Sequence, residues 1–561
     1  MKVIIIGGVA AGATAAARLR RLDKDVEIVM FEKGNYISYA NCGLPYYVSG
    51  EIETKEQLLL MTPELFKNRF QIDVRVASEV IDIDADSKMV TVHDYFKNNN
   101  YQEKYDKLVI ATGSKPINLP VKGNDHPAIQ QLWTFDDFDK IKRKVIVEKI
   151  KNVCVIGGGF VGIETVENLK ELGINVDIIE REKQILNNFD FEMVQPLHKH
   201  INENKVSLYL KTEVLGFEDS HGKIKVETSR FDKVYDMVIS SAGVKPQSEL
   251  AKKVGIACNR QGGIIVDKYL QTNIQDIYAI GDVIEVEHYI NHQKTMIPLA
   301  GPANKQGRIL ADNLLEAKIP YQGSLGSSII KVFNMVGATT GLNEKQLQVT
   351  GLKRHQDYEV TIIQQKSHAG YYPDAKPLVM KVIYDQSQQI LGAQIIGFEG
   401  VDKRIDVIST VIHYHGKVTD LKDLQIAYAP PFAMAKDAVN MLGYVGENME
   451  NGYINLILPD EYQAIKDDVI TLDVRENDER KLVKIEGSYH IPYGELFERY
   501  QELDKNKPIV VYCAIGVRAY NCARILMQRG YQKVTVLSGG LGFYLDYCFN
   551  QEDKCDDCFS E

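Results

Sequence analysis

The chain has 561 residues and a formal net charge of −10, and 45% of its residues are hydrophobic and 25% charged. This length exceeds that of one ordinary domain and predicts about three or four. The negative charge argues against a general nucleic-acid role, and no apolar run approaches the roughly 20 residues of a membrane span. The opening residues, "MKVIIIGG", are too short for a secretory signal and predict a first strand. We therefore expect a cytoplasmic protein with neither a nucleic-acid nor a membrane partner.

Two stretches show the strand–turn–helix–strand pattern of a dinucleotide-binding unit. In the first, the strand "KVIIIGG" leads into the turn from Gly7 to Gly12, then an alanine-rich helix, then a strand that ends near Glu32. The second unit covers residues 153–180 and begins with the strand "VCVIGGG". Two such units in one chain predict two nucleotides, or one cofactor and one cosubstrate.

The second unit carries the complete fingerprint, with Gly157, Gly159 and, where its helix opens, Gly162. These glycines allow a tight turn, a close backbone approach to pyrophosphate and tight helix–strand packing, with the phosphates at the helix N-terminus. Glu180 follows Gly162 by 18 residues and is placed to accept from a ribose 2′-hydroxyl. A carboxylate there repels a 2′-phosphate and favours NADH, although the neighbouring Arg181 leaves NADPH open.

The first unit has a weaker fingerprint. Gly7 and Gly12 are present, but Val9 stands at the middle glycine position, and Glu32 follows Gly12 by 20 residues. A lone glycine-rich turn is often only a tight turn, whereas two complete units are hard to explain by packing alone. Two more apolar strands end in small-residue turns: "LVIATGSKP" at 108–116 and "IYAIGDV" at 277–283.

One cysteine lies in the segment "SYANCGLPYY", residues 38–47, just after the first nucleotide unit. The next cysteine after Cys42 is Cys154, so the dithiol of an ordinary disulfide reductase is missing. The eight cysteines form no framework pattern, which suits a reducing compartment. Cys42 could cycle through a sulfenic acid, form a mixed disulfide with a small external thiol, or be a buried structural residue.

The order of these features resembles the FAD-dependent pyridine nucleotide-disulfide oxidoreductases, over residues 1 to about 445. The resemblance implies that the first unit holds FAD, the second holds the nicotinamide nucleotide, and residues 325–445 form a homodimer interface. It also implies a mixed α/β fold with two Rossmann-like domains followed by an α+β dimerisation domain. The implied FAD-binding residues are Gly7, Gly8, Ala10, Ala11, Gly12, Glu32, Lys33, Ala111, Thr112, Gly113, Gly281 and Asp282.

Within this superfamily, the turn "GGVAAGA" and the loop "YANCGLPYY" together resemble the coenzyme A-disulfide reductases. The flavin oxidases and peroxidases place a histidine in this turn to support a sulfenic acid, whereas this chain has Ala10. The resemblance implies that Cys42 pairs with coenzyme A, so that the missing sulfur belongs to the substrate. The implied coenzyme A-binding residues are Thr14, Arg18, Arg21, Ser38 and Asn41.

The spacing of Thr14, Arg18 and Arg21 independently places them on one helix face. Two guanidinium groups suit the phosphates of an ADP moiety, although cationic faces on acidic proteins are usually only solvated. Two further segments, "HAGYYPDA" (368–375) and "AYAPPF" (427–432), resemble the family's tyrosine segments at the dimer interface. They offer Tyr428 and either Tyr371 or Tyr372 as proton donors, and ordinary interface tyrosines are the alternative.

The C-terminal part alternates short apolar strands with helices and predicts another small α/β domain. Its strand "IVVYC" ends at Cys513, and the loop "CAIGVRA" opens a helix. Loop N–H groups, helix dipoles and Arg518 would stabilise a Cys513 thiolate. With "LDVRE" and "EGSYHIP", this pattern resembles the rhodanese family over residues 460–545 and implies a persulfide on Cys513; phosphatases share the scaffold, and a degenerate domain is the alternative.

Two short segments flank this domain. The connector "GYVGENMENGY" (443–453) is rich in Gly and Asn and predicts a flexible coil that would let the domain reach an active site. The tail holds Cys555 and Cys558, only half of a structural zinc set, so we expect an acidic tail without a metal, with a resolving dithiol as the alternative.

These features predict FAD-dependent, NAD(P)H-driven reduction of coenzyme A disulfide, coenzyme A persulfide or polysulfide through Cys42, with Cys513 handling sulfane sulfur. A disulfide reductase alone has no use for a rhodanese unit, which favours the persulfide. The alternatives are an NADH oxidase or peroxidase that cycles Cys42 through a sulfenic acid, and a non-enzymatic flavoprotein sulfur carrier or sensor. The expected parts are FAD-binding 1–150 and 266–324, NAD(P)H-binding 151–265, dimerisation 325–445, linker 446–459, rhodanese-like 460–545 and tail 546–561.

Overall fold

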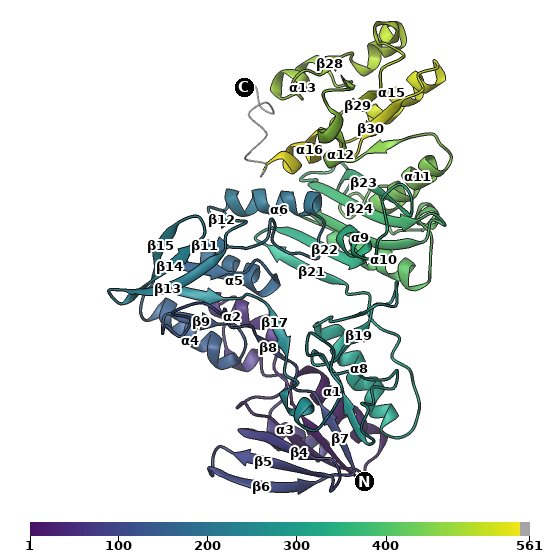
Figure 1. Cartoon of the computed structure of the whole chain (residues 1–561). Helices are drawn as coiled ribbons and strands as arrows, with labels where there is room; N and C mark the ends of the chain where they lie inside the picture. The colour runs from purple at the N-terminus through teal and green to yellow at the C-terminus, as the bar shows by residue number, and fades with distance from the viewer. Residues whose placement is uncertain (550–561) are drawn as a thin grey trace. The chain divides into compact units, whose positions relative to one another are not determined.

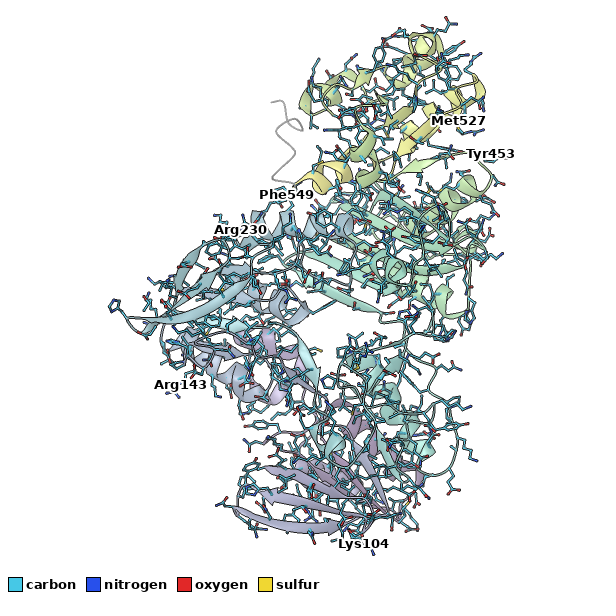
Figure 2. The ribbon with its side chains drawn as sticks, in the orientation of Figure 1. Lys104, Arg143, Arg230, Tyr453, Met527 and Phe549 are labelled. Atoms are coloured by element: carbon cyan, nitrogen blue, oxygen red, sulfur yellow. The ribbon has the colours of Figure 1, made fainter. Side chains whose placement is uncertain are left out.

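The computed structural model describes residues 1–549, so the side chains end at Phe549 (Figure 2). The predicted Cys555 and Cys558 pair lies outside the described residues. Two compact units are present, one of residues 1–183 with 209–326, and one of residues 184–208 with 327 onward. Among the described residues, no helix combines the length and the apolar character that crossing a bilayer requires.

The first Rossmann-like sheet lies in the first unit and contains five parallel strands in the order β18-β7-β1-β2-β3, of which Figure 1 labels β7. The strand of the "AIGD" segment joins it beside the "ATG" strand, although the two are far apart in the sequence. The strands are β1 (Lys2–Ile6), β2 (Glu27–Phe31), β3 (Asp73–Arg75), β7 (Lys107–Ile110) and β18 (Ile277–Ala279).

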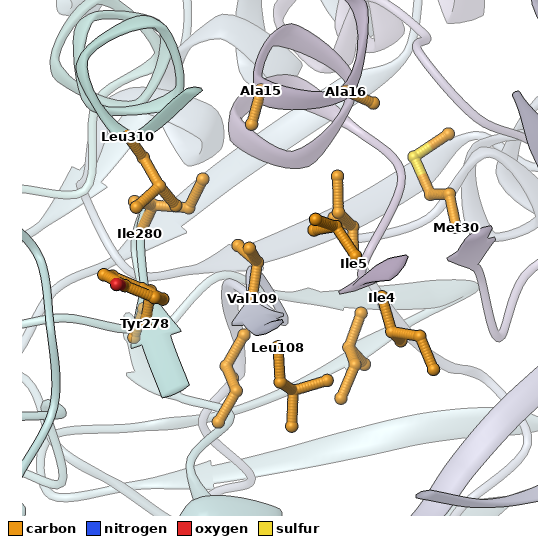
Figure 3. Close-up of a cluster of buried hydrophobic side chains, with 14 of the residues drawn as sticks. Ile4, Ile5, Ala15, Ala16, Met30, Leu108, Val109, Tyr278, Ile280 and Leu310 are labelled. Atoms are coloured by element: carbon orange, nitrogen blue, oxygen red, sulfur yellow. The ribbon is translucent and has the colours of Figure 1, made fainter. Parts of the chain in front are cut away.

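The helix α1 (Ala10–Leu22) packs its alanines between this sheet and the helix α8 (Ala300–Asn313). Ala15 and Ala16 are fully buried near Ile5, and Leu310 of α8 reaches down beside Ile280 (Figure 3). A Cβ at Gly307 of α8 would lie 2.5 Å from the Ala11 carbonyl oxygen. Small residues are therefore required where the two helices meet.

The second Rossmann-like sheet, with strand order β12-β11-β10-β16-β9, repeats this design. Its helix α5 (Phe160–Glu171) begins two residues before the predicted Gly162, because extended Gly159 takes the N-cap position. The strands are β9 (Ile129–Gln131), β10 (Asn152–Ile156), β11 (Asn175–Ile179), β12 (Ser207–Tyr209) and β16 (Met237–Ser240).

Each Rossmann-like sheet is accompanied by a three-stranded antiparallel sheet of consecutive hairpins. The first comprises β4 (Ser78–Asp84), β5 (Met89–Asp94) and β6 (Asn99–Lys104), and the second β13 (Val214–Ser220), β14 (Lys223–Thr228) and β15 (Asp232–Tyr235).

The second unit contains a five-stranded antiparallel sheet in the order β21-β22-β25-β24-β23, covered by the helix α10 (Val401–His413). Its strands are β21 (Ser328–Val332), β22 (Met335–Gly341), β23 (Tyr358–Lys366), β24 (Pro377–Asp385) and β25 (Ile390–Gly397). The helix α6 (Phe191–Glu203) packs on this sheet, although residues 184–208 were expected within the nicotinamide-binding part.

A buried charge cluster explains this difference. The Lys381 ammonium is fully buried, lies 2.7 Å from carboxylate oxygens of both Asp190 and Glu344, and also contacts Glu192. Burial raises the pKa of Glu192 to about 7. Removing one partner from such a buried cluster costs about 3–5 kcal/mol, so the segment that carries Asp190 and Glu192 is fixed to the second unit.

The C-terminal sheet is parallel and has the strand order β26-β30-β29-β27-β28. The strands are β26 (Leu456–Ile457), β27 (Ile470–Asp473), β28 (Tyr489–His490), β29 (Ile509–Tyr512) and β30 (Val534–Leu537), and the flanking helices include α12 (Pro459–Ile465), α15 (Val517–Gln528) and α16 (Gly540–Cys548). Residues 546–548, expected in the tail, are therefore helical.

The prediction of a flexible connector at 443–453 is wrong, because the helix α11 (Ala438–Glu450) covers most of it. Its glycines serve close packing. A Cβ at Gly443 would lie 2.3 Å from the Lys422 backbone nitrogen, and one at Gly446 would lie 2.9 Å from Val418 Cγ2. The glycine content thus marks the contact between α11 and the 3-10 helix η3 (Val418–Asp423), and not a mobile coil.

Direct contacts also fasten the C-terminal domain to the antiparallel sheet. The Arg354 guanidinium donates two hydrogen bonds to Glu344, at 2.8 and 2.9 Å, and contacts Asp460 and Glu461 of α12 at 3.1 and 3.0 Å. The Ser538 hydroxyl donates to the Ile362 carbonyl oxygen at 2.9 Å. The Cys513 domain is therefore docked within the second unit, and the predicted tether cannot carry it as a free arm.

Substituting Gly443 with alanine tests this packing. We expect Gly443→Ala to lower the free energy of unfolding by about 1–3 kcal/mol, since the added methyl group overlaps the η3 backbone. The control is Gly301→Ala in α8, where nothing lies within 4 Å of the added Cβ, and which should be neutral or stabilising by up to about 1 kcal/mol. Denaturant unfolding followed by circular dichroism measures both variants. An unchanged free energy of unfolding for Gly443→Ala would support the flexible connector instead.

Candidate active site

The two nucleotide turns adopt the same conformation. Gly7 has φ +105° and Gly157 has φ +104°, in the left-handed region that favours glycine. A Cβ at Gly7 would lie 2.2 Å from the Ala111 carbonyl oxygen, and one at Gly157 would lie 2.3 Å from the Ser241 carbonyl oxygen. Both turns therefore press against the neighbouring strand end and require glycine.

The remaining fingerprint glycines serve different purposes. A Cβ at Gly12 would lie 2.0 Å from the Gly7 carbonyl oxygen, and one at Gly162 would lie 2.4 Å from that of Gly157. Nothing lies within 4 Å of a Cβ at Gly159, so its open side admits a ligand to the backbone. This arrangement fits a pyrophosphate at the N-terminus of α5.

One carboxylate closes each nucleotide turn. Glu32 accepts hydrogen bonds from the backbone N–H groups of Gly8 at 2.9 Å and Gly34 at 2.8 Å, and burial raises its pKa. Glu180 accepts from Gly158 at 2.7 Å and from Glu182 at 2.9 Å. The two carboxylates are thus held at the position where a dinucleotide ribose is recognised.

The other predicted flavin-binding residues gather at the ends of β7 and β18. Thr112 donates its hydroxyl to the Gln247 carbonyl oxygen at 2.7 Å, and Gly113, with φ +67°, has open space at its Cβ position. Gly281 (φ +81°) precedes Asp282, whose pKa is raised by burial to about 6. Lys33 instead points to Glu79, at 2.8 Å.

Cys42 lies in a single 3-10 turn, η1 (Asn41–Gly43), immediately before the helix α2 (Leu44–Ser49). The residue is exposed. Partial burial of its thiol, followed by the charges of Glu164 and Asp282, nevertheless raises the pKa of Cys42. Cys42 therefore feels the charges of Asp282, from the predicted flavin-binding segment, and of Glu164, from the second nucleotide unit.

Glu164 is the site residue that sequence reasoning missed. It lies on α5, two residues after Gly162, and burial raises its pKa to about 7, with the charge of Glu167 adding to the effect. The helix α2 packs on α5, where the Ser49 hydroxyl donates to Asn168 at 2.6 Å. The sequence could have indicated Glu164, because an acidic residue closely follows the glycine fingerprint and lies near the N-terminal end of α5, where a nucleotide would bind.

The predicted coenzyme A-binding face of α1 carries hydrogen bonds within the first unit. Arg18 donates from Nε and Nη2 to Asp312 of α8, at 3.2 and 2.9 Å, and the Thr14 hydroxyl donates to Asn304 at 2.6 Å. The Arg21 guanidinium lies 5.2 Å from the centre of the Phe70 ring. The three side chains share a face as predicted, but Arg18 already has a carboxylate partner.

Ser38 ties the Cys42 loop to the first nucleotide turn. Its backbone N–H donates to the Gly8 carbonyl oxygen at 2.8 Å, and its φ is +46°, a rare value for serine. Such backbone strain is common where a functional loop is held in one conformation. Asn41 begins the turn that presents Cys42.

The predicted tyrosines lie in the second unit and are not equivalent. The hydroxyl groups of Tyr371 and Tyr428 are hydrogen-bonded at 2.7 Å, and this bond raises the pKa of Tyr428. Tyr372 instead stacks edge-on against His368, with ring centres 5.6 Å apart. Tyr371 and Tyr428 are both exposed, and Tyr428 lines a hollow of about 440 Å³.

Cys513 lies at the base of a loop between β29 and α15. The Gly516 backbone N–H donates to the Cys513 sulfur at 3.1 Å, as predicted for a loop that cradles a thiolate. The Arg518 guanidinium donates two hydrogen bonds to Glu479, both at 2.6 Å. The cysteine is buried beneath this loop.

These folds and turns together define a flavin- and nicotinamide-dependent oxidoreductase with an added C-terminal α/β domain. Residues 1–307 match the pyridine nucleotide-disulphide oxidoreductase family, residues 327–439 its dimerisation domain, and residues 458–544 the rhodanese-like domain. The chain therefore belongs to the pyridine nucleotide-disulphide oxidoreductase family. The predicted fold class and the predicted cofactors, FAD and a nicotinamide nucleotide, are confirmed.

Relatives within the family carry more specific names. The chain is 34% identical over 445 residues to coenzyme A disulfide reductase from Staphylococcus aureus (strain bovine RF122 / ET3-1), covering 79% of this chain and 99% of the relative. It is also similar to reduced Bacillus anthracis CoADR-RHD (TM-score 0.94, 43% identity, 98% of each chain). A second similar structure is an NAD-dependent persulfide reductase from A. fulgidus (TM-score 0.91, 35% identity, 97% of this chain and 100% of that one).

A likeness to an oxidase is weaker. The water-forming NADH oxidase from Lactobacillus brevis has a TM-score of 0.77 and 26% identity, and the match covers 81% of this chain and 99% of that one. The shared fold alone therefore does not separate the reductases from the oxidases.

The charge of Glu164 should control the reactivity of Cys42. We expect Glu164→Gln to lower the Cys42 pKa, because removing a nearby negative charge stabilises the thiolate. The pH profile of Cys42 alkylation by iodoacetamide, resolved by peptide mapping on the flavin-loaded protein, measures the shift. Glu171→Gln, an exposed position at the far end of α5, is the control, and an unshifted profile for Glu164→Gln would remove Glu164 from the site.

Proposed function

We propose that this protein uses NADH to reduce disulfides and persulfides of coenzyme A through the single thiol of Cys42. The observation that carries the proposal is an exposed cysteine beside the nucleotide turns with no second thiol on its loop. The other described cysteines of the first unit are Cys154, fully buried in β10, and Cys258, whose sulfur contacts the Ile256 carbonyl oxygen at 3.6 Å. The second sulfur is therefore the substrate's own.

The reaction follows from thiol–disulfide exchange. The Cys42 thiolate attacks one sulfur of coenzyme A disulfide, which forms a Cys42–coenzyme A mixed disulfide and releases one coenzyme A thiolate. Two electrons and a proton then convert the mixed disulfide into a Cys42 thiolate and free coenzyme A. The first nucleotide turn and Glu32 would hold FAD, which would supply the relay of these two electrons from NADH.

A persulfide fits the same chemistry. Attack of the Cys42 thiolate on the inner sulfur of coenzyme A persulfide forms the same mixed disulfide and releases hydrosulfide, so charge and sulfur balance. The attacking species is the thiolate, and the raised pKa of Cys42 means that the thiol must first be deprotonated. The rate of reduction should therefore rise with pH.

The α1 face and the Cys42 loop are proposed to bind the coenzyme A moiety. Arg18 donates from Nε and Nη2 to Asp312, and neither of these hydrogen bonds uses Nη1. The Nη1 group can therefore donate to a phosphate. Arg21, Thr14, Ser38 and Asn41 complete the proposed set. The pairing with Asp312 fixes the Arg18 side chain in one orientation and lowers the entropy lost on binding.

The tyrosine pair is proposed to serve the active site of a partner subunit in a homodimer. Residues 327–439 match a dimerisation domain, and both hydroxyl groups are exposed in the single chain. The bond between Tyr371 and Tyr428 favours these two over Tyr372 as donors to a departing thiolate.

The rhodanese-like domain is proposed to accept sulfane sulfur on Cys513 and to return it as a persulfide of a small thiol. Since α11 is a packed helix and not a flexible arm, the carrier must be a diffusible molecule such as coenzyme A. The physiological substrate is then a persulfide or polysulfide, and hydrogen sulfide is the product.

Replacing the thiol tests the proposed function. We expect Cys42→Ser to lower NADH-dependent reduction of coenzyme A disulfide by at least about 1,000-fold, because an alcohol forms no mixed disulfide, while the flavin absorbance remains. The control Cys258→Ser should keep both. Retained disulfide reduction in Cys42→Ser would refute the proposal, and wild-type oxygen or peroxide consumption that exceeds disulfide reduction would establish the oxidase alternative.

A further inference from the structure

The loop around Cys513 has an aliphatic rim. Its six residues, "CAIGVR" at 513–518, contain one charged side chain, Arg518. Ile515 and Val517 are 38% and 46% exposed and flank Gly516 on the loop. Gly516 has φ +112°, and nothing lies within 4 Å of a Cβ there, so open space adjoins the N–H group that reaches the sulfur.

The single loop cation has a carboxylate partner. Glu479 lies on the short helix α13 (Asn477–Leu482) and accepts hydrogen bonds from both terminal nitrogens of Arg518, each at 2.6 Å. These hydrogen bonds raise the pKa of Arg518, and the neighbouring Cys513 thiol adds to the effect. A bidentate guanidinium–carboxylate pair is among the strong hydrogen-bonded arrangements.

The two other arginines near this helix are paired as well. Arg475 donates to both oxygens of buried Asp473, at 3.0 and 2.7 Å, and Arg480 donates to Asp473 at 3.0 Å. Arg475 and Arg480 thus share one carboxylate, and Arg475 and Asp473 are buried beneath the surface. On the Cys513 loop itself, the one cation, Arg518, is balanced one to one by Glu479.

We infer that Glu479 sets the sulfur-donor specificity of Cys513 by balancing the charge of Arg518, so that donors with at most one negative charge on the sulfur-bearing group, such as thiol persulfides, are preferred over dianionic oxyanion donors such as thiosulfate. This inference rests on the proposed role of Cys513 in accepting sulfane sulfur and names the class of donor. Glu479 acts through Arg518 and the local charge and is a specificity-determining residue, not a catalytic one.

The transfer steps balance with either donor. The Cys513 thiolate attacks the outer sulfur of thiosulfate, forms a Cys513 persulfide anion and releases sulfite. With methanethiosulfonate, a monoanion that has a methyl group in place of one oxygen, the same attack releases methanesulfinate. Cyanide, added as the acceptor, removes the outer sulfur as thiocyanate and restores the Cys513 thiolate. The two donors therefore differ by one charge and share the same sulfur chemistry.

The experiment measures thiocyanate formation by the full-length, flavin-loaded protein with each donor. We expect Glu479→Gln to raise the ratio of kcat/KM for thiosulfate to that for methanethiosulfonate by about 3- to 10-fold, since an unbalanced guanidinium attracts the dianion more strongly. The gain should shrink at high salt, because the interaction is screened. Glu479→Asp should restore a ratio close to that of wild type.

The matched control is Asp478→Asn. Asp478 is the neighbouring residue, pairs with Lys481 at 2.9 Å, and its side chain is 93% exposed, so the same change in net charge is made outside the loop. Its donor ratio should stay at the wild-type value. A Glu479→Gln protein in which both donors lose activity equally, or in which the ratio is unchanged, would show that Glu479 only supports the loop and would overturn the inference.

Cys513→Ser separates this inference from the proposed function. If Cys513→Ser abolishes thiocyanate formation while Glu479→Gln leaves the donor ratio unchanged, the specificity inference fails and the sulfur-carrying role stands. If Cys513→Ser retains full transfer with both donors, the proposed role of Cys513 fails, and the inference fails with it. Flavin content and the thermal midpoint of each variant identify a loss caused by misfolding.

Discussion

Among the cysteines of the described residues, Cys42 is the exposed one, and its loop holds it next to two nucleotide turns. One cysteine cannot form a disulfide by itself, and this limits the chemistry open to the site. Ser38 ties the Cys42 loop to the first turn through Gly8, and α2 ties it to the helix of the second turn. Burial, followed by the charges of Glu164 and Asp282, raises the pKa of the thiol. The proposed function follows from this arrangement, because a substrate that brings its own sulfur would complete the disulfide.

Paired charges give the second unit its organisation. The cluster around Lys381 and the contacts of Arg354 link α6, the antiparallel sheet and the C-terminal domain into one body. The Arg354 contacts and the packed helix α11 hold the Cys513 domain against the antiparallel sheet. The proposed function therefore assigns sulfur transfer to a diffusible carrier. The Arg518–Glu479 pair applies the same charge balance at the loop itself.

The sequence allowed prediction of features whose causes are local. The positive φ values of Gly7 and Gly157 belong to the turns themselves, so the glycine spacing predicted both turns. Features that depend on distant partners could not be predicted. Arg18 pairs with a residue 294 positions away, and the glycines of α11 pack against η3, which made a helix resemble a coil. The choice between Tyr371 and Tyr372 likewise required the contact with Tyr428.

The most direct test of the central claim is intact-mass measurement of the oxidised, flavin-loaded protein after incubation with coenzyme A disulfide in the absence of NADH. The account predicts one coenzyme A per chain, mapped by peptide analysis to Cys42, and its release as free coenzyme A when NADH is added. A Cys42 that carries no coenzyme A, or an adduct that NADH leaves in place, would contradict the claim that the substrate supplies the second sulfur.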